Sequence, residues 1–115
     1  MAENLTAAEI RARAQAYKLK TETVHVKEWG TDVQLRELSG PQFVYVTEKA
    51  VNKDGTVSQA RFICETLVQT LLDMNGERIF KSGDDELLTT GIISQLGPMV
   101  MQLNDIGDGA PDPKK

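Results

Sequence analysis

The chain has 115 residues, of which 40% are hydrophobic and 26% charged, a composition that suits one globular domain and leaves too little chain for two. Its 13 basic and 17 acidic residues give a net charge of −4, which disfavours a general phosphate-binding surface for nucleic acid. The apolar runs span only a few residues and the N-terminus lacks a signal-peptide pattern, so we expect a cytoplasmic protein without a membrane segment.

Residues 1–22 are predicted to form an N-terminal helical arm. Thr6 and Glu9 have the spacing of a capping box, which starts a helix over residues 5–20. The apolar side chains of this helix are mostly alanines, so burial would stabilise it little. We therefore expect the arm to be partly mobile or to become ordered against another chain.

A single folded domain is predicted over residues 23–107, and it begins with a β-hairpin over residues 23–37. Valine and leucine alternate with polar residues in two runs, and Trp29 and Gly30 lie between the runs. A hairpin alone is barely stable in water. Its valine face is therefore expected to pack on helices.

The next element is predicted as a helix over residues 39–51. Ser39 and Gln42 have capping-box spacing, with a proline in the first turn. The residues that would line one face of this helix are Phe43, Val46 and Ala50. The β-branched residues beside the Asp54-Gly55 turn signal are equally compatible with a second hairpin, so residues 42–51 stay open between helix and strand.

Two further helices are predicted, over residues 58–75 and 84–106. Ser58 caps the first of them and Gly76 closes it. The second starts in an acidic turn and continues, kinked, through Gly97-Pro98. Its apolar stripe consists of Leu88, Ile92, Leu96, Met99, Leu103 and Ile106. With residues 108–115 expected to be a disordered tail, the fold class is mainly α with a small β-hairpin (α+β).

The residues that usually carry chemistry are few. His25, the only histidine, falls on a predicted strand, and Cys64, the only cysteine, falls on the apolar stripe of a helix. The acidic residues 84–86 have the charge that a helix start prefers. We therefore expect no catalytic residue, no metal and no cofactor.

The clearest alternative to a protein-binding role is a small nucleic-acid-binding regulator. Arg11, Arg13, Lys18 and Lys20 form a basic cluster on the first helix, with one aromatic residue among them. Acidic residues flank the cluster, which favours an ordinary solvated helix face instead.

Apolar side chains supply a plausible contact surface for a protein partner. Methionine is adaptable in such surfaces because its unbranched side chain repacks easily. The candidate partner-binding residues are Trp29, Leu88, Ile92, Leu96, Met99 and Leu103.

Residues 24–40 resemble the opening of the tail assembly chaperones of long-tailed bacteriophages. In that family a hairpin with a Trp-Gly turn leads into an Arg-Glu-Leu-Ser-Gly helix start, as at residues 36–40. The Asn-Gly-Glu-Arg-Ile-Phe link at residues 75–80 and the Asp-Asp-Glu start at residues 84–86 are also similar to the family pattern. The resemblance covers residues 23–106.

The resemblance implies a non-enzymatic chaperone in the host cytoplasm. Such a protein binds the long tape measure protein and keeps it soluble while tail tube subunits assemble around it. We also expect the protein to associate with itself. If an apolar patch of one copy docks on a different patch of the next copy and the contacts do not close into a ring, the result is an open spiral. The candidate self-association residues are Ile10, Tyr17 and Trp29. Another non-catalytic phage adaptor, with a different partner, stays an alternative.

Overall fold

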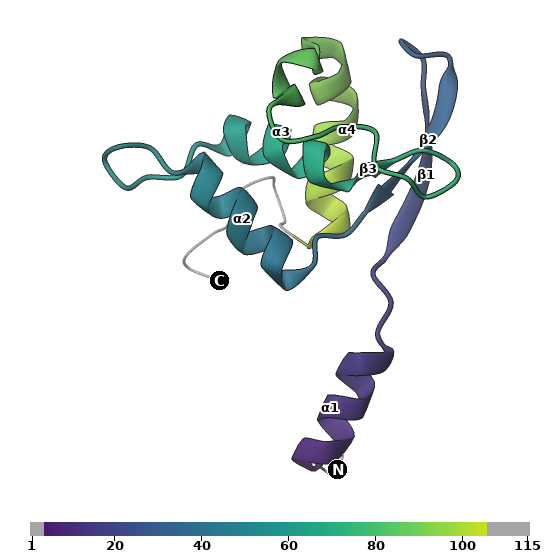
Figure 1. Ribbon diagram of the computed structural model, residues 1–115, viewed down its shortest axis with the longest axis vertical. Helices are drawn as coiled ribbons and strands as arrows, with labels where there is room; N and C mark the ends of the chain where they lie inside the picture. The colour runs from purple at the N-terminus through teal and green to yellow at the C-terminus, as the bar shows by residue number, and fades with distance from the viewer. Residues whose placement is uncertain (1–3, 106–115) are drawn as a thin grey trace.

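The computed structural model describes residues 4–105 (Figure 1). The elements in chain order are α1 (Ala7–Ala16), β1 (Thr21–Val26), β2 (Thr31–Arg36), α2 (Gly40–Ala50), α3 (Gln59–Thr70), β3 (Leu71–Leu72), the 3-10 helix η1 (Asp84–Leu87) and α4 (Thr90–Leu103). The described part is thus helical with a small antiparallel sheet, and the predicted α+β class is confirmed.

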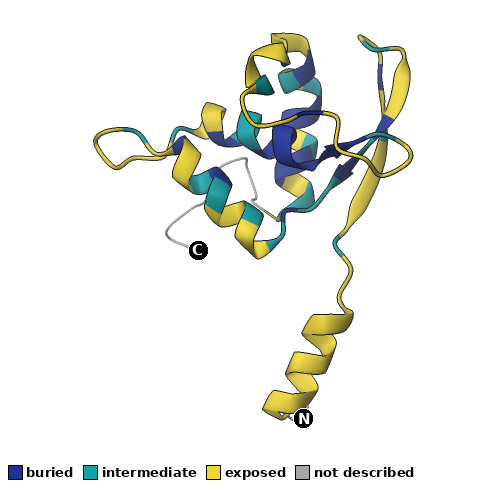
Figure 2. Ribbon diagram, in the orientation of Figure 1, coloured by how far each residue is buried: buried dark blue, intermediate teal, exposed yellow. Residues whose placement is uncertain are grey.

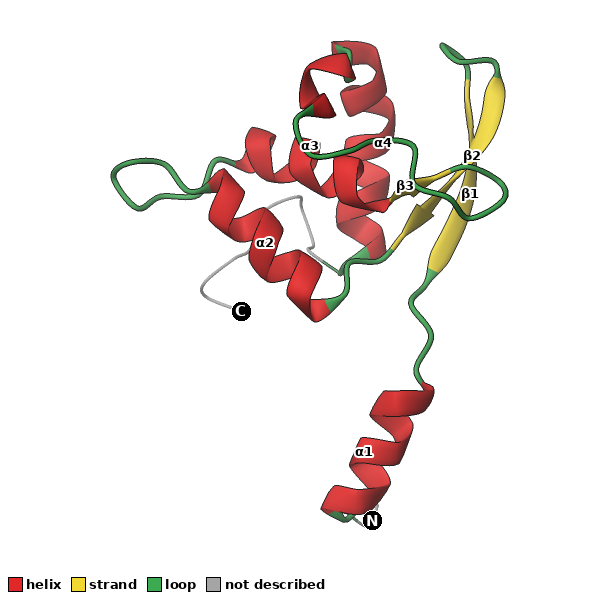
Figure 3. Cartoon of the chain, viewed as in Figure 1, coloured by secondary structure: helices red, strands yellow, loops and turns green. Residues whose placement is uncertain are grey.

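The predicted hairpin is formed by β1 and β2, which are joined by a turn over residues 27–30 (Figure 3). Gly30 takes a positive φ of 63° in this turn, a backbone conformation that favours glycine. Val26, Val33 and Leu35 are buried, so the apolar face of the hairpin packs on the helices as expected. The short strand β3 adds to the other side of β2, which gives the sheet order β1-β2-β3.

The structure decides the open choice at residues 42–51 in favour of a helix. The Ser39 hydroxyl accepts from the Gln42 N–H, and the Gln42 side chain accepts from the Ser39 N–H, so both halves of the capping box are present. Val46 and Ala50 are buried, as predicted. Phe43 is exposed instead, although its ring packs edge-on against that of Phe62, with 6.0 Å between the ring centroids.

The predicted end of the third helix is wrong. Ser58 caps the start of α3, but the helix ends at Thr70 and not at residue 75. Leu71 and Leu72 leave the helix to pair with Leu35 and Gln34 of β2. Gly76 therefore lies in the turn after β3 and does not close the helix.

The predicted start of the last helix is also wrong. The acidic residues form the separate helix η1, and α4 begins at Thr90, where the Thr89 hydroxyl accepts from the Ile92 N–H at 3.2 Å. Pro98 lies inside α4, as predicted. The helix ends at Leu103, three residues earlier than expected. The tail predicted at residues 108–115 lies outside the described residues.

The core lies between α2, α3, α4 and the inner face of the sheet (Figure 2). Gly97 lets α4 approach α3 closely, because a Cβ at this position would lie 3.3 Å from Ile63 Cγ2. The buried positions of α4 are Ile92, Leu96, Gly97, Val100 and Met101. The helices and the hairpin thus share one apolar core, and α1 contributes no buried residue to it.

Candidate interaction surface

The helix α1 projects away from the rest of the molecule, with its whole surface exposed (Figure 2). Its predicted capping box is formed, since the Glu9 N–H donates to Thr6 Oγ1 at 3.2 Å and the Thr6 N–H donates to Glu9 Oε1 at 2.9 Å. No residue of α1 is buried, and Ile10 is 55% exposed. A helix of this length is marginal in water without packing. Of the described elements, α1 is therefore the one whose stability would increase most if another surface packed against it.

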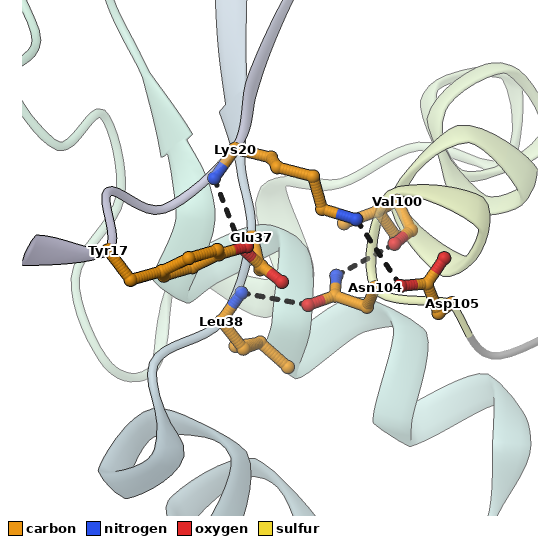
Figure 4. A network of polar contacts seen from close by, with 7 residues as sticks. All are labelled: Tyr17, Lys20, Glu37, Leu38, Val100, Asn104 and Asp105. Atoms are coloured by element: carbon orange, nitrogen blue, oxygen red, sulfur yellow. Dashed lines mark hydrogen bonds and ion pairs between the residues drawn. The ribbon is translucent and has the colours of Figure 1, made fainter. Parts of the chain in front are cut away.

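A small polar network holds the base of this arm against the domain (Figure 4). The Tyr17 hydroxyl donates to Glu37 Oε1 at 2.7 Å, and the Lys20 N–H donates to the same oxygen at 3.0 Å. The Lys20 ammonium forms an ion pair with Asp105 at 3.3 Å. The arm is thus attached both to the end of β2 and to the end of α4.

The network shifts the protonation of its members. The Tyr17 hydroxyl, followed by the Lys20 N–H, holds the pKa of Glu37 below the ordinary value of 4.5, because both donate to the charged carboxylate. The same bond to Glu37 raises the pKa of Tyr17. The carboxylate of Glu37 therefore contributes to arm attachment above pH 4.5, and this contribution is lost as the pH falls through the lowered pKa.

Tyr17→Phe tests this assignment. Without the phenolic donor, the pKa of Glu37 should rise towards its ordinary value, and an NMR titration of the side-chain carboxyl carbons measures the change. Glu9 is an internal control, because hydrogen bonds to Thr6 lower its pKa independently of Tyr17. An unchanged titration of Glu37 in the variant would show that Tyr17 does not hold the arm through this carboxylate.

The predicted partner-binding stripe, which runs from Leu88 before α4 to Leu103 at its end, lies largely inside the core. Leu88, Ile92 and Leu96 are buried, so a partner reaches them only if the core opens. Met99 and Leu103 are partly exposed and pack at the edge of the core. Of the predicted stripe, these two side chains are the ones that a partner can contact without unfolding the domain.

Trp29 is partly buried in the hairpin turn. The centroid of its ring lies 5.8 Å from that of the Phe80 ring, and the side chain packs against the core. Trp29 therefore attaches the hairpin turn to the domain and keeps only part of its surface for a partner. Ile10 and Tyr17, the other candidates for self-association, are both more than half exposed.

Large apolar side chains are also exposed at positions that the sequence interpretation did not select. Val44 and Val51 lie seven residues apart, on one side of α2 and its C-terminal end, and Val51 pairs with Val57 across the following turn. Four apolar residues in succession at 43–46 were the available signal, because a helix lying on a core buries only part of such a run.

The residues considered for chemistry lie apart from any recognisable site. His25 Nδ1 lies 2.8 Å from Asp32 Oδ1 on the exposed hairpin. Burial raises the pKa of the Cys64 thiol, which is opposite to the activation of a nucleophile. Within residues 4–105, His, Cys, Asp and Glu side chains nowhere gather in threes around a position for a metal ion. In the same part of the chain, no helix is long and apolar enough to cross a bilayer.

The described residues thus define a small α+β protein with one unpacked basic arm. No family model matches the sequence, and no curated protein matches it. Among solved structures, the chain is similar to the tail assembly chaperone of bacteriophage HK97, with a TM-score of 0.59 and 22% identity. The match covers 90% of this chain and 100% of that chain. The two proteins therefore share a fold.

Proposed function

We propose that this protein is a tail assembly chaperone of a long-tailed bacteriophage and not an enzyme. The observation that carries the proposal is the similarity to the HK97 tail assembly chaperone, which extends over nearly the whole of both chains. The sequence resemblance over residues 23–106 supports the same role from the hairpin and from two later motifs. The role would be exercised in the host cytoplasm.

The proposed client is the tape measure protein, around which tail tube subunits assemble. A long helical client exposes apolar surface that aggregates when it is bare, so a chaperone must cover many short stretches of it. The exposed face of α1 around Ile10 and Tyr17 supplies apolar area for such contacts. Met99 and Leu103 supply a second, smaller area on α4, and the exposed part of Trp29 lies apart from them at the hairpin turn.

The protein is also proposed to associate with itself through the arm. An arm that docks on α4 or on the hairpin of the next copy makes a contact between two different surfaces, and such contacts build an open spiral unless they close into a ring. Light scattering over a range of concentrations, with and without the tape measure protein, tests this idea. A mass that stays that of one chain throughout would contradict it.

Ile10→Glu tests the role of the arm in the proposed function. Co-expression with the tape measure protein from the same genome should give a soluble client with the natural chaperone, and clearly less soluble client with the variant, because the largest aliphatic side chain of α1 is replaced by a charge. Gln15→Glu is the matched control, since it adds the same charge to the same helix and removes no apolar surface.

Two results would count against the proposal. Equal solubility of the client without any chaperone would remove the proposed function itself. If the client were equally soluble with Ile10→Glu and with Gln15→Glu, the apolar surface of the arm would have no role in the proposed function. Salt-dependent binding of DNA through the basic residues of the arm would instead favour the nucleic-acid-binding alternative.

A further inference from the structure

Strand β1 forms a free edge of the sheet (Figure 3). The sheet order is β1-β2-β3, so β1 has a strand on one side only. An edge strand presents a row of backbone N–H and C=O groups that can pair with another extended chain. In β1, only the residues whose backbone N–H and C=O groups face away from β2 can bind another chain.

The hydrogen-bond pattern of the hairpin shows which groups point outward. The Glu37 N–H donates to the Lys20 carbonyl at 2.8 Å, so this pair is hydrogen-bonded. Hydrogen-bonded pairs alternate with non-bonded ones in an antiparallel ladder. In the observed register the pairs of Glu22 and Val24 with β2 are bonded, and the backbone groups of Thr21, Thr23 and His25 point away from β2.

An independent contact supports this assignment at His25. Its carbonyl accepts a hydrogen bond from the Gln95 side chain of α4 at 2.8 Å, which requires the carbonyl to point out of the hairpin. Helix α4 thereby covers the His25 end of the edge. The remaining part, Thr21 to Thr23, offers two N–H and two C=O groups to the outside.

This open part carries one charged residue, Glu22, but lacks the other features that usually protect an edge. It contains no proline, and the register with β2 runs without a bulge from Thr21 to Val26. Thr21, Glu22 and Thr23 are all exposed. The strand is also rich in β-branched residues, which favour the extended conformation. The edge is therefore ready to accept a further strand.

We propose that the edge of Thr21–Thr23, with the flanking Val24, binds an extended segment of a different protein as an added antiparallel strand. Glu22 and Val24 lie two residues apart, so their side chains are on the same face of the strand. The segment that fits carries a lysine or arginine opposite Glu22 and an apolar residue opposite Val24, which reads apolar-x-basic along the partner. Backbone pairing supplies the affinity and these two side chains supply the selectivity.

The contacts of His25 and Glu22 disfavour a second copy of this chain as the occupant. Symmetric pairing centred on Thr23 sets Thr21 opposite His25, whose carbonyl is already bonded to Gln95. Symmetric pairing centred on Glu22 sets two carboxylates directly opposite each other, which is unfavourable. Symmetric pairing centred on Thr21 sets Lys20 opposite Glu22, but the Lys20 ammonium is already paired with Asp105. The inference does not rest on the proposed chaperone function, because it uses a surface separate from α1 and a client segment that is extended, not helical.

Amide hydrogen exchange with a defined peptide tests the proposal. The probe is a capped nonapeptide of threonines with Val-Thr-Lys at its centre, added to the ¹⁵N-labelled full chain. Its addition should slow exchange at the Thr21 and Thr23 amides, whereas the Glu22 and Val24 amides are already protected within the hairpin. No slowing at Thr21 and Thr23 would overturn the proposal. Slowing that depends on protein concentration without peptide would also overturn it, because a second copy would then be the occupant.

Two sets of variants make the test specific. Thr23→Pro removes an N–H that points away from β2 and should weaken peptide binding roughly tenfold, whereas Thr23→Val keeps the N–H and should bind as the natural chain does. Independently, replacing the lysine of the peptide with glutamate should weaken binding, and Glu22→Lys should restore it. Equal binding by the two Thr23 variants, or no rescue by Glu22→Lys, would contradict the proposed edge.

Discussion

Leu96→Ala should lower the free energy of unfolding by about 2–5 kcal/mol, the usual cost of truncating a fully buried leucine. Leu96 is 0% exposed and lies on the side of α4 that packs in the core. The cost has two parts, the lost transfer of apolar atoms out of water and the cavity that the neighbouring side chains fill only in part. Urea denaturation followed by the fluorescence of Trp29, the single tryptophan, measures it.

Leu87→Ala is the matched control for this prediction. It removes the same atoms from a side chain that is 58% exposed, so the change in stability should stay within about 0.5 kcal/mol. Equal and small effects at both positions would mean that Leu96 faces solvent, as its interpretation as a partner-binding residue implied. A large effect at Leu96 alone would identify it as a core residue.

Asn104→Ala should lower the free energy of unfolding by about 1–3 kcal/mol, the cost of leaving a partly buried backbone donor without a partner. Asn104 Oδ1 accepts from the Leu38 N–H at 2.8 Å, and its Nδ2 donates to the Val100 carbonyl at 2.8 Å (Figure 4). One side chain thus joins the end of α4 to the segment between β2 and α2.

Exchange at a single amide separates this effect from a general loss of helix. In Asn104→Ala the Leu38 N–H should exchange faster with solvent, because its acceptor is gone. Gln102→Ala is the control, since Gln102 is an exposed residue of the same helix and should change neither the stability nor the Leu38 exchange. An unchanged Leu38 amide in Asn104→Ala would show that the contact adds nothing.

The features that could be predicted from the sequence depend on a few neighbouring residues. The capping boxes of Thr6 and Ser39 and the cap at Ser58 each involve residues three apart, and all three are present in the structure. The hairpin followed from alternation within two short runs. Such signals are local, because capping and strand patterning are properties of a single segment.

The features that could not be predicted depend on residues distant in sequence. The third helix ends at Thr70 because Leu71 pairs with Leu35, which lies 36 residues earlier, and periodicity alone would have continued the helix. On α4 the buried stripe runs through Ile92, Leu96 and Val100, not through Met99. This helix is apolar on most of its surface, so its position against α3 decides which residues are buried, and sequence periodicity does not.

The candidate contact surface was predicted only in part for the same reason. The arm was predicted because the apolar side chains of its helix are mostly alanines, and the structure shows Ile10 exposed. The α4 residues were apolar and regularly spaced, which describes a core face and a docking face equally well. Burial against other elements separates the two, and burial is a property of the assembled domain.

The ion pair between Lys20 and Asp105 brings the two ends of the folded domain together. A label on residue 105 therefore lies beside the root of the arm, whereas a label on Leu5 lies at the far end of a helix about 15 Å long. Fluorescent dyes attached at these two places would report different events. The first would report changes at the attachment of the arm, and the second would report contacts made at the tip of the arm.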